Sequence, residues 1–195
     1  MRATSLVKQM LGLRSVTVIE VVVRPYELLV KIRLTRSRLE CPKCSYVTRS
    51  CYDTRTLDSR WRHLDIGTYQ TWLSCQLRRL RCPTHGVITE SVPFARPVDE
   101  SRFTRDFEHL VAWATAKMDK TTVTKLLRVA WRTVGTICER VVAEELDPNR
   151  LDDLFILGVD EISYRKRHNY LTLVTNHETG KIVYASRGEK CVESR

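Results

Sequence analysis

The chain has 195 residues, of which 43% are hydrophobic and 29% charged, and this composition excludes wholesale disorder. No apolar run approaches the roughly 20 residues that a membrane helix needs. The N-terminal stretch lacks the continuous apolar core and the cleavage site of a secretory signal. We therefore expect a soluble, cytoplasmic chain of one medium domain or two to three small modules.

The net charge of +10 lies in the first half of the chain. Residues 1–97 carry 17 Lys and Arg against 7 Asp and Glu, whereas the two signs balance over residues 98–195. A localised basic excess is typical of a surface that binds a polyanion, most often nucleic acid. A basic surface that is merely solvated would give the same count.

Residues 1–40 are predicted to form a short helix and a β-hairpin. Two runs rich in β-branched residues, Val16–Val23 and Glu27–Leu34, are separated by Arg24-Pro-Tyr. Such runs around a turn signal favour paired strands.

Four potential metal ligands follow. The motif Cys41-Pro-Lys-Cys44 and the motif Cys82-Pro-Thr-His85 are separated by 37 residues, and each is a Cys-Pro-x-ligand knuckle. Zinc takes four tetrahedral nitrogen or sulfur ligands, which two short knuckles brought together by strands supply. We predict a structural zinc site in a β module over residues 41–92, which the metal would stabilise; unrelated buried cysteines are the alternative.

The other cysteines and a histidine of this region have no partner at knuckle spacing. The chain has seven cysteines and no secretory context, which argues against a disulfide framework. Cys75 lies in the alternating stretch Tyr69–Leu77 and is expected in a strand or the core. Cys51 could replace a zinc ligand, and His63 is expected to be a surface or packing side chain.

Arginines and aromatic residues alternate in the same module, around Trp61, Tyr69 and Trp72. Guanidinium groups bind phosphates in bidentate fashion and aromatic rings can stack on bases, although both tryptophans could equally fill the small core. The predicted nucleic-acid contacts here are Arg55, Arg60, Arg62, Arg78, Arg79 and Arg81.

A linker at Pro93–Pro97 is predicted to lead into a helical module over residues 98–147. Residues 102–117 place Phe103, Phe107, Leu110, Val111 and Ala114 on one helical face. A short helix at 120–128, a turn at 129–130 and a longer helix at 131–145 have helix-turn-helix spacing. A plain helical hairpin is the alternative. The inward side chains would be Val134, Ile137, Cys138 and Val141. The side chains near DNA would be Lys120, Lys125, Trp131, Arg132, Thr133 and Thr136.

Three β-strands are predicted after Asp147-Pro-Asn, at residues 154–161, 169–175 and 181–185, with a hairpin turn at 177–180. The first ends in Asp160 and Glu161. Carboxylates suit Mg²⁺ or Mn²⁺, but neighbours on a strand point to opposite faces, so these two cannot share one ion without distortion.

The order of these parts resembles the N-terminal part of a bacterial insertion-sequence transposase of the ISL-three family. The resemblance covers roughly residues 35–188 and is carried by the two knuckles, the stretch Arg78–Gly86, the helix-turn-helix and the string Leu157–Tyr170. It implies that the first two modules bind terminal inverted repeats of double-stranded DNA. It also implies that residues 151–195 begin an RNase H-like domain with an Asp-Asp-Glu triad, in which Asp160 matches the first aspartate and helps to hold Mg²⁺ or Mn²⁺.

The expected architecture is therefore α+β and multi-module: a zinc-stabilised β-rich N-terminal module, a helix-turn-helix module and an incomplete RNase H-like β-meander. The later Asp and Glu of the triad are absent, and the last residues, 190–195, lose the strand pattern, so we expect a truncated transposase that does not cut DNA alone. Such a nucleoid-associated fragment could form homo-oligomers, or associate with the full-length transposase and inhibit it.

Two other functions remain open. One is a transcriptional regulator built from a zinc ribbon and a helix-turn-helix, without nuclease ancestry. The other is an RNA-binding zinc ribbon, since basic and aromatic residues do not themselves select DNA over RNA.

Overall fold

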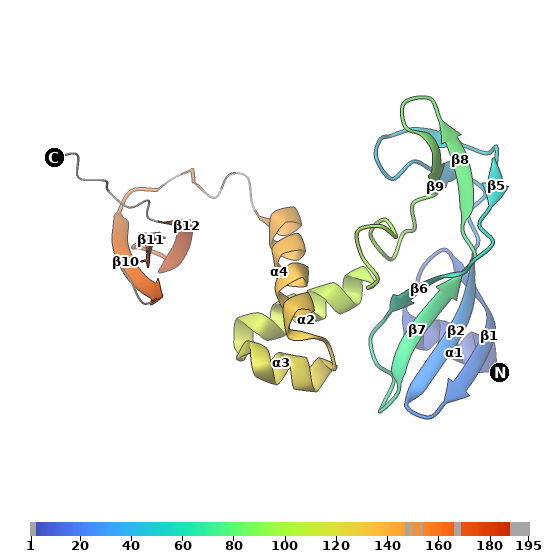
Figure 1. Cartoon of the computed structure of the whole chain (residues 1–195), viewed down its shortest axis with the longest axis horizontal. Helices are drawn as coiled ribbons and strands as arrows, with labels where there is room; N and C mark the ends of the chain where they lie inside the picture. The colour runs from blue at the N-terminus through green and yellow to red at the C-terminus, as the bar shows by residue number, and fades with distance from the viewer. Residues whose placement is uncertain (1–2, 147–148, 150, 153, 166–168, 188–195) are drawn as a thin grey trace. The chain divides into compact units, whose positions relative to one another are not determined.

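The computed structural model describes residues 3–146, 149, 151–152, 154–165 and 169–187. The chain divides into two compact units, residues 1–141 and residues 142–195 (Figure 1), and each is described by itself. The predictions for Asp147, Pro148 and residues 190–195, Cys191 among them, lie outside the described part. No helix in that part is long and apolar enough to cross a membrane.

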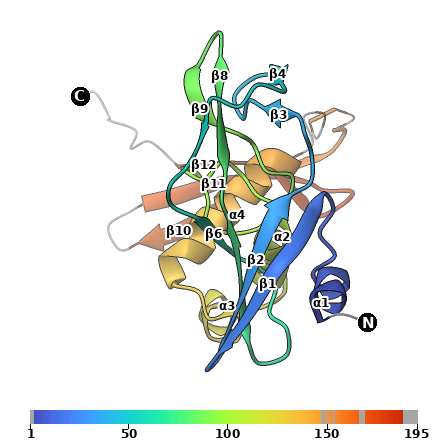
Figure 2. The ribbon, with the colours of Figure 1, turned by 90° about the vertical axis from the view of Figure 1, so that its right-hand side faces the viewer.

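The first unit contains a four-stranded sheet in the order β1-β2-β7-β6. The predicted hairpin is confirmed as the antiparallel pair β1–β2, and β2 then pairs in parallel with β7, which pairs antiparallel with β6. Helix α1 lies beside β1 (Figure 2). The sheet thus combines two strands that precede the first knuckle with two strands that follow it. The elements are α1 (Ala3–Leu11), β1 (Val16–Arg24), β2 (Glu27–Leu34), β6 (Ser59–Arg62) and β7 (Gln70–Cys75).

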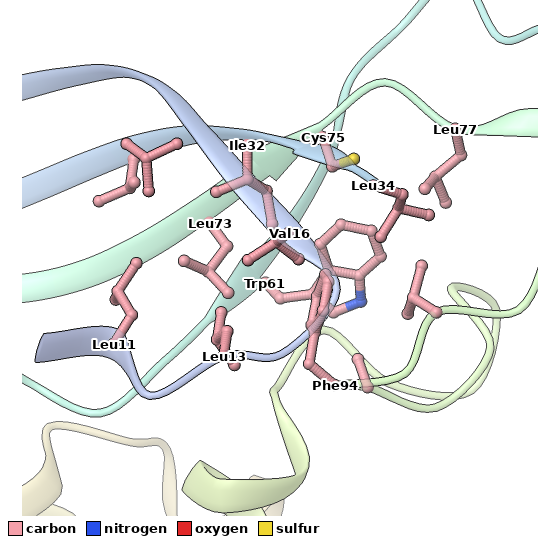
Figure 3. Close-up of a cluster of buried hydrophobic side chains, with 14 of the residues drawn as sticks. Leu11, Leu13, Val16, Ile32, Leu34, Trp61, Leu73, Cys75, Leu77 and Phe94 are labelled. Atoms are coloured by element: carbon pink, nitrogen blue, oxygen red, sulfur yellow. The ribbon is translucent and has the colours of Figure 1, made fainter. Parts of the chain in front are cut away.

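The sheet buries a hydrophobic core around Trp61, which is fully buried (Figure 3). Phe94 packs edge-on against Trp61, with ring centroids 5.4 Å apart. Phe94 and Ala95 are both buried in this core, so the segment 93–97, predicted to be a linker, is instead part of the sheet domain. Cys75 is fully buried, as predicted, and burial raises the pKa of its thiol to about 11.

Five short strands form the part of the first unit that carries the two knuckles. The antiparallel pair β3–β4 holds the first knuckle in its connection, and the second lies between β8 and β9 in the sheet β5-β8-β9. We call these strands and their turns the ribbon. They are β3 (Leu39–Glu40), β4 (Val47–Thr48), β5 (Asp53–Thr54), β8 (Arg78–Cys82) and β9 (Gly86–Thr89).

Three helices follow the ribbon, and the last of them continues past residue 141, where the first unit ends. Thr104 and Asp119 cap α2 and α3 by accepting hydrogen bonds from backbone N–H groups of the first turn. Arg128 ends α3 in the left-handed conformation, with φ 53° and ψ 49°, and α4 begins at Trp131. The predicted short helix, turn and longer helix are confirmed. The helices are α2 (Arg105–Lys117), α3 (Lys120–Leu127) and α4 (Trp131–Glu145).

The helices pack through the predicted apolar faces. Phe107 and Val111 of α2 and Val134 and Ile137 of α4 are buried in a common core, whereas Cys138 is half-buried. Phe103 stacks on Phe107, with centroids 5.4 Å apart.

The second unit is an antiparallel meander in the order β10-β11-β12, with the predicted turn at residues 177–180. The three predicted strands are confirmed, although β10 begins at Leu157 rather than at residue 154. The strands are β10 (Leu157–Arg165), β11 (Asn169–Asn176) and β12 (Lys181–Arg187).

Candidate metal centre and nucleic-acid interface

Four metal-ligating side chains meet at the turns of the ribbon. Cys41, Cys44, Cys82 and His85 each offer one ligand atom, and these atoms all lie within 4.8 Å of one another. The Sγ atoms of Cys44 and Cys82 are 3.6 Å apart, and His85 Nδ1 is 3.6 Å from the Sγ atoms of both Cys41 and Cys82. We call these residues the Cys/His cluster. They are the four that the knuckle spacing predicts as ligands.

The geometry of the Cys/His cluster fits a zinc ion. Ligand atoms about 2.3 Å from a tetrahedral zinc are separated by about 3.8 Å, close to the observed 3.6 Å. Three thiols and an imidazole are a donor set typical of structural zinc, and four protein ligands leave no position for a substrate. Within the part of the chain that the structure describes, no other group of three or more such ligands occurs.

The ribbon has little else to hold it together. Its buried core consists of Leu39, Leu80 and two members of the cluster, Cys41 and Cys82. Gly86 ends the second knuckle with φ +66°, a conformation that favours glycine, so that β9 can return along β8. A module with so small a core depends on a metal for stability.

Two thiols of the cluster have shifted pKa values. Burial raises the pKa of Cys82, but hydrogen bonds from the backbone N–H and the ring of His85 outweigh it and lower the pKa to about 6. The backbone N–H of Tyr46 lowers the pKa of Cys44, but burial and the thiols of Cys41 and Cys82 raise it overall. Because zinc binds thiolates, the low pKa of Cys82 favours metal binding near neutral pH.

The remaining candidates for the metal site do not join it. Cys51 is exposed and its Sγ is 3.1 Å from the carbonyl oxygen of Asp53. His63 is buried, with Nδ1 2.9 Å from the Thr104 hydroxyl and Nε2 3.2 Å from the carbonyl oxygen of Leu11. His63 is therefore a packing side chain.

Four of the six arginines predicted to contact phosphates form ion pairs within the chain. Arg62 is only 3% exposed, which does not fit a phosphate contact. A hydrogen bond from Arg79 holds the pKa of the Asp53 carboxyl below its usual range, so Asp53 is charged at neutral pH and pairs with Arg79. The ion pairs are Arg60–Glu27, Arg62–Asp65, Arg78–Glu90 and Arg79–Asp53.

Arg81 differs from these arginines. It is exposed and makes no ion pair within the residues that the structure describes. Its guanidinium lies 5.1 Å from the ring centroid of Tyr52, at a cavity of about 420 Å³ that no carboxylate lines. The half-buried Arg55 contacts the Ser59 hydroxyl at 3.3 Å. The cavity is lined by Tyr46, Thr48, Ser50, Cys51, Tyr52 and Arg81.

The side chains predicted to approach DNA from the helices lie mostly on the surface. Trp131, at the start of α4, is 61% exposed, and the Lys120 ammonium lies 3.3 Å from its ring centroid. Thr133 is half-buried. The exposed members of this set are Lys125, Trp131, Arg132 and Thr136.

Sequence reasoning missed two ionic clusters of the first unit. The fully buried carboxylate of Glu108 accepts hydrogen bonds from Arg96 Nε at 2.8 Å, Ser101 Oγ at 2.7 Å and Arg140 Nη2 at 2.5 Å. An acid beside the apolar face of α2 is the one local signal for this cluster. The second cluster joins Asp65 to the nearby Arg62 and to Arg128, which lies 63 residues further along the chain.

Asp160 lies exposed on β10, opposite Leu173 of β11, and Glu161 is its neighbour along the strand. Within the described residues, no group of three metal-ligating side chains includes Asp160.

Comparison with known proteins matches two stretches of the chain, one around the ribbon and one around the helices, to transposase families. Residues 30–85 match the zinc-finger of transposase IS204/IS1001/IS1096/IS1165, and residues 90–142 match the helix-turn-helix domain of transposase family ISL3. The transposase for insertion sequence element IS1557, from two strains of Mycobacterium tuberculosis, is 41% identical over 149 residues, or 76% of this chain. The chain spans about a third of the length of these relatives, since the match covers 33% of each. No solved structure matches the chain.

The ribbon with its Cys/His cluster and the helix-turn-helix that follows it are therefore two modules of kinds that occur in insertion-sequence transposases. Over residues 30–142 the chain is thus similar to the zinc-finger and helix-turn-helix modules of ISL3-family transposases.

Proposed function

We propose that this chain binds duplex DNA at the terminal inverted repeats of an insertion sequence, through the helix-turn-helix and the ribbon. The observation that carries the proposal is the helix-turn-helix itself: an eight-residue helix, a turn at Arg128 and a 15-residue helix that begins with exposed Trp131 and Arg132. In such motifs the start of the second helix contacts base edges in the major groove. The kinship to an insertion-sequence transposase supports the choice of target.

The candidate side chains differ in whether they are free to contact DNA. Arg132 and Thr136 on α4 would contact the groove, with Lys125 on α3 near the backbone. Arg81, on the ribbon, would bind a DNA phosphate. Its guanidinium lies near the ring of Tyr52, and no carboxylate lines the cavity there to neutralise its charge. Arg79, by contrast, is held by Asp53.

A zinc ion bound by the Cys/His cluster would keep the ribbon folded, and so would place Arg81. Residues 151–195 would begin an RNase H-like domain with Asp160 as its first acid, which the β10-β11-β12 meander supports. One carboxylate does not hold the two Mg²⁺ or Mn²⁺ ions of such chemistry, so cleavage would need further acidic ligands.

The experiment is a binding titration by fluorescence anisotropy against two duplexes: the terminal repeat of the element that encodes the chain, and a shuffled sequence of the same composition. We expect tighter binding to the repeat, and affinity that falls steeply between about 50 and 200 mM salt. Arg132→Ala should cost about 1–3 kcal/mol of binding to the repeat. Arg81→Gln should reduce the slope of log affinity against log salt by about 1, with Arg79→Gln as the matched control.

Equal binding to both duplexes would contradict recognition of the repeat. Binding to neither would contradict the function as a whole.

A further inference from the structure

We propose that the ribbon and the helix-turn-helix read one continuous duplex site at a fixed spacing, and that the carboxylate of Asp65 fixes this spacing by joining the helices to the sheet. The inference rests on the proposed DNA binding. It adds the kind of site bound: a single composite sequence, in place of two sequences whose separation can vary.

The joint is centred on the loop that follows β6. One carboxylate oxygen of Asp65 accepts a hydrogen bond from Arg62, and the other accepts one from Arg128. Arg128 Nη1 also donates to the carbonyl oxygen of Thr68, at 3.1 Å. The guanidinium of Arg128 is thus held at two points of one loop of the sheet domain.

Arg62 anchors the sheet side of this joint. Its guanidinium lies between aromatic rings of two elements, 5.3 Å from the centroid of Phe107 on α2 and 5.9 Å from that of Trp72 on β7. Its backbone N–H donates to the carbonyl oxygen of Arg102 at 2.8 Å, and its carbonyl accepts from the N–H of Thr104 at 2.9 Å. The end of β6 therefore binds directly to the segment that caps α2.

Arg128 lies in the turn just before α4, the helix that would enter the major groove. It adopts the left-handed conformation between α3 and α4, so its backbone sets the direction in which α4 leaves the turn. A side chain bound to the sheet at this residue holds the turn against the sheet domain. Isolated surface pairs contribute little, but this pair shares its acid with a buried arginine and belongs to a network.

A fixed joint has a consequence for the DNA. Two modules on a flexible linker bind sub-sites over a range of separations, whereas two modules in one rigid body require both sub-sites on one face of the duplex. Inserting about half a helical turn, or about 5 bp, between the sub-sites places them on opposite faces.

The test compares Arg128→Gln with Lys117→Gln, its matched control. Each removes one exposed positive charge from the helical module, but only Arg128→Gln breaks the contact to Asp65. Arg128→Gln also leaves the buried Arg62–Asp65 pair intact, so the sheet should fold. Each protein is used to select binding sites from a pool of random duplexes, and the selected site is then bound with and without an insertion of about 5 bp.

We expect the wild-type chain and Lys117→Gln to select one motif of fixed spacing and to lose about tenfold or more in affinity on insertion. Arg128→Gln keeps the backbone bonds of Arg62 with Arg102 and Thr104, so it should still select the motif but should lose less affinity on insertion than the wild-type chain does. Variable spacing in the wild-type chain would overturn the inference and leave the proposed DNA binding standing. Failure of the wild-type chain to select any motif would overturn both.

A second readout does not use DNA. Backbone residual dipolar couplings of the wild-type chain should fit one alignment tensor over residues 16–141, and those of Arg128→Gln should fit a single tensor less well, with the largest deviations in the helices. An equally good fit in both proteins would overturn the role of Asp65, whatever the DNA result.

Discussion

His63 shows how one buried side chain connects three parts of the first unit. The carbonyl of Leu11 can only accept, so Nε2 of His63 carries the proton and Nδ1 accepts from the hydroxyl of Thr104. That hydroxyl oxygen in turn accepts from the N–H of Phe107 and caps α2. A proton added to Nδ1 would force the Thr104 hydroxyl to turn its hydrogen away and to accept from the ring as well as from Phe107.

The free energy of unfolding of the chain should therefore decrease as the pH falls below about 6.5, the ordinary pKa of histidine. Burial lowers the pKa of His63, while the contact with Leu11 and the charge of Asp106 only partly oppose it. The unfolded chain then binds the proton first, so the free energy of unfolding decreases as pH falls from about 6.5 to the lower pKa of the folded state. His63→Gln should flatten this decrease in urea unfolding series from about pH 7.5 to about 5. The exposed His177→Gln variant is the control, and an equal slope in wild type and His63→Gln would contradict the argument.

The Cys/His cluster gives a second prediction at the scale of the residue. Wild-type protein should contain about one zinc per chain, and Cys41→Ser should reduce this below about half and lower the melting temperature, because the ribbon core is small. Chelation with EDTA should have the same effect on melting. Cys51→Ser, which changes an exposed thiol outside the cluster, should leave zinc content and melting unchanged. Equal zinc in Cys41→Ser and wild type would show that the cluster is not the metal site.

At the scale of the element, the ion cluster at Glu108 holds three segments together. Its carboxylate binds Arg96 of the segment before α2, Arg140 of α4 and the hydroxyl of Ser101. Glu108→Gln leaves two arginines without the charge that compensates them. Removing one partner from a buried ion pair costs about 3–5 kcal/mol, and we expect a loss of that size in chemical denaturation of the chain. Glu139→Gln, an exposed acid of α4, should change stability by less than about 0.5 kcal/mol. A neutral Glu108→Gln would mean that the cluster contributes no net stability.

Elements with a periodic or local signal could be predicted from the sequence. The apolar spacing of Phe107, Val111 and Ala114 defines the buried face of α2, and the two knuckles identify the four residues of the Cys/His cluster. The parallel pairing of β2 with β7 could not be predicted, because it depends on contacts between residues about 40 positions apart with no local signature. For the same reason the arginines looked alike in the sequence, since Arg78 and Arg81 differ only in the acids that the fold places beside them.

At the scale of the whole molecule, the two units differ in how much surface they bury. The first unit has a core around Trp61 and another around Phe107, both nearly free of solvent. In the second unit, Asn176 is the one buried residue among those described at 154–187. Large apolar side chains stay exposed on its strands, including Val159 at 69% and Ile182 at 59%. Three strands without a buried face are at most marginally stable.

Limited digestion should therefore separate the two units. We expect low trypsin concentrations to remove the strands β10 to β12 while a fragment that contains residues 1–141 survives, because cleavage follows the segments that open at low free energy. Mass spectrometry identifies the fragment, and its zinc content and binding to duplex DNA show whether the ribbon and the helix-turn-helix remain intact. Loss of both units at the same rate would mean that the meander is stabilised by the first unit. A surviving fragment that still binds DNA would assign the binding function to residues 1–141 alone.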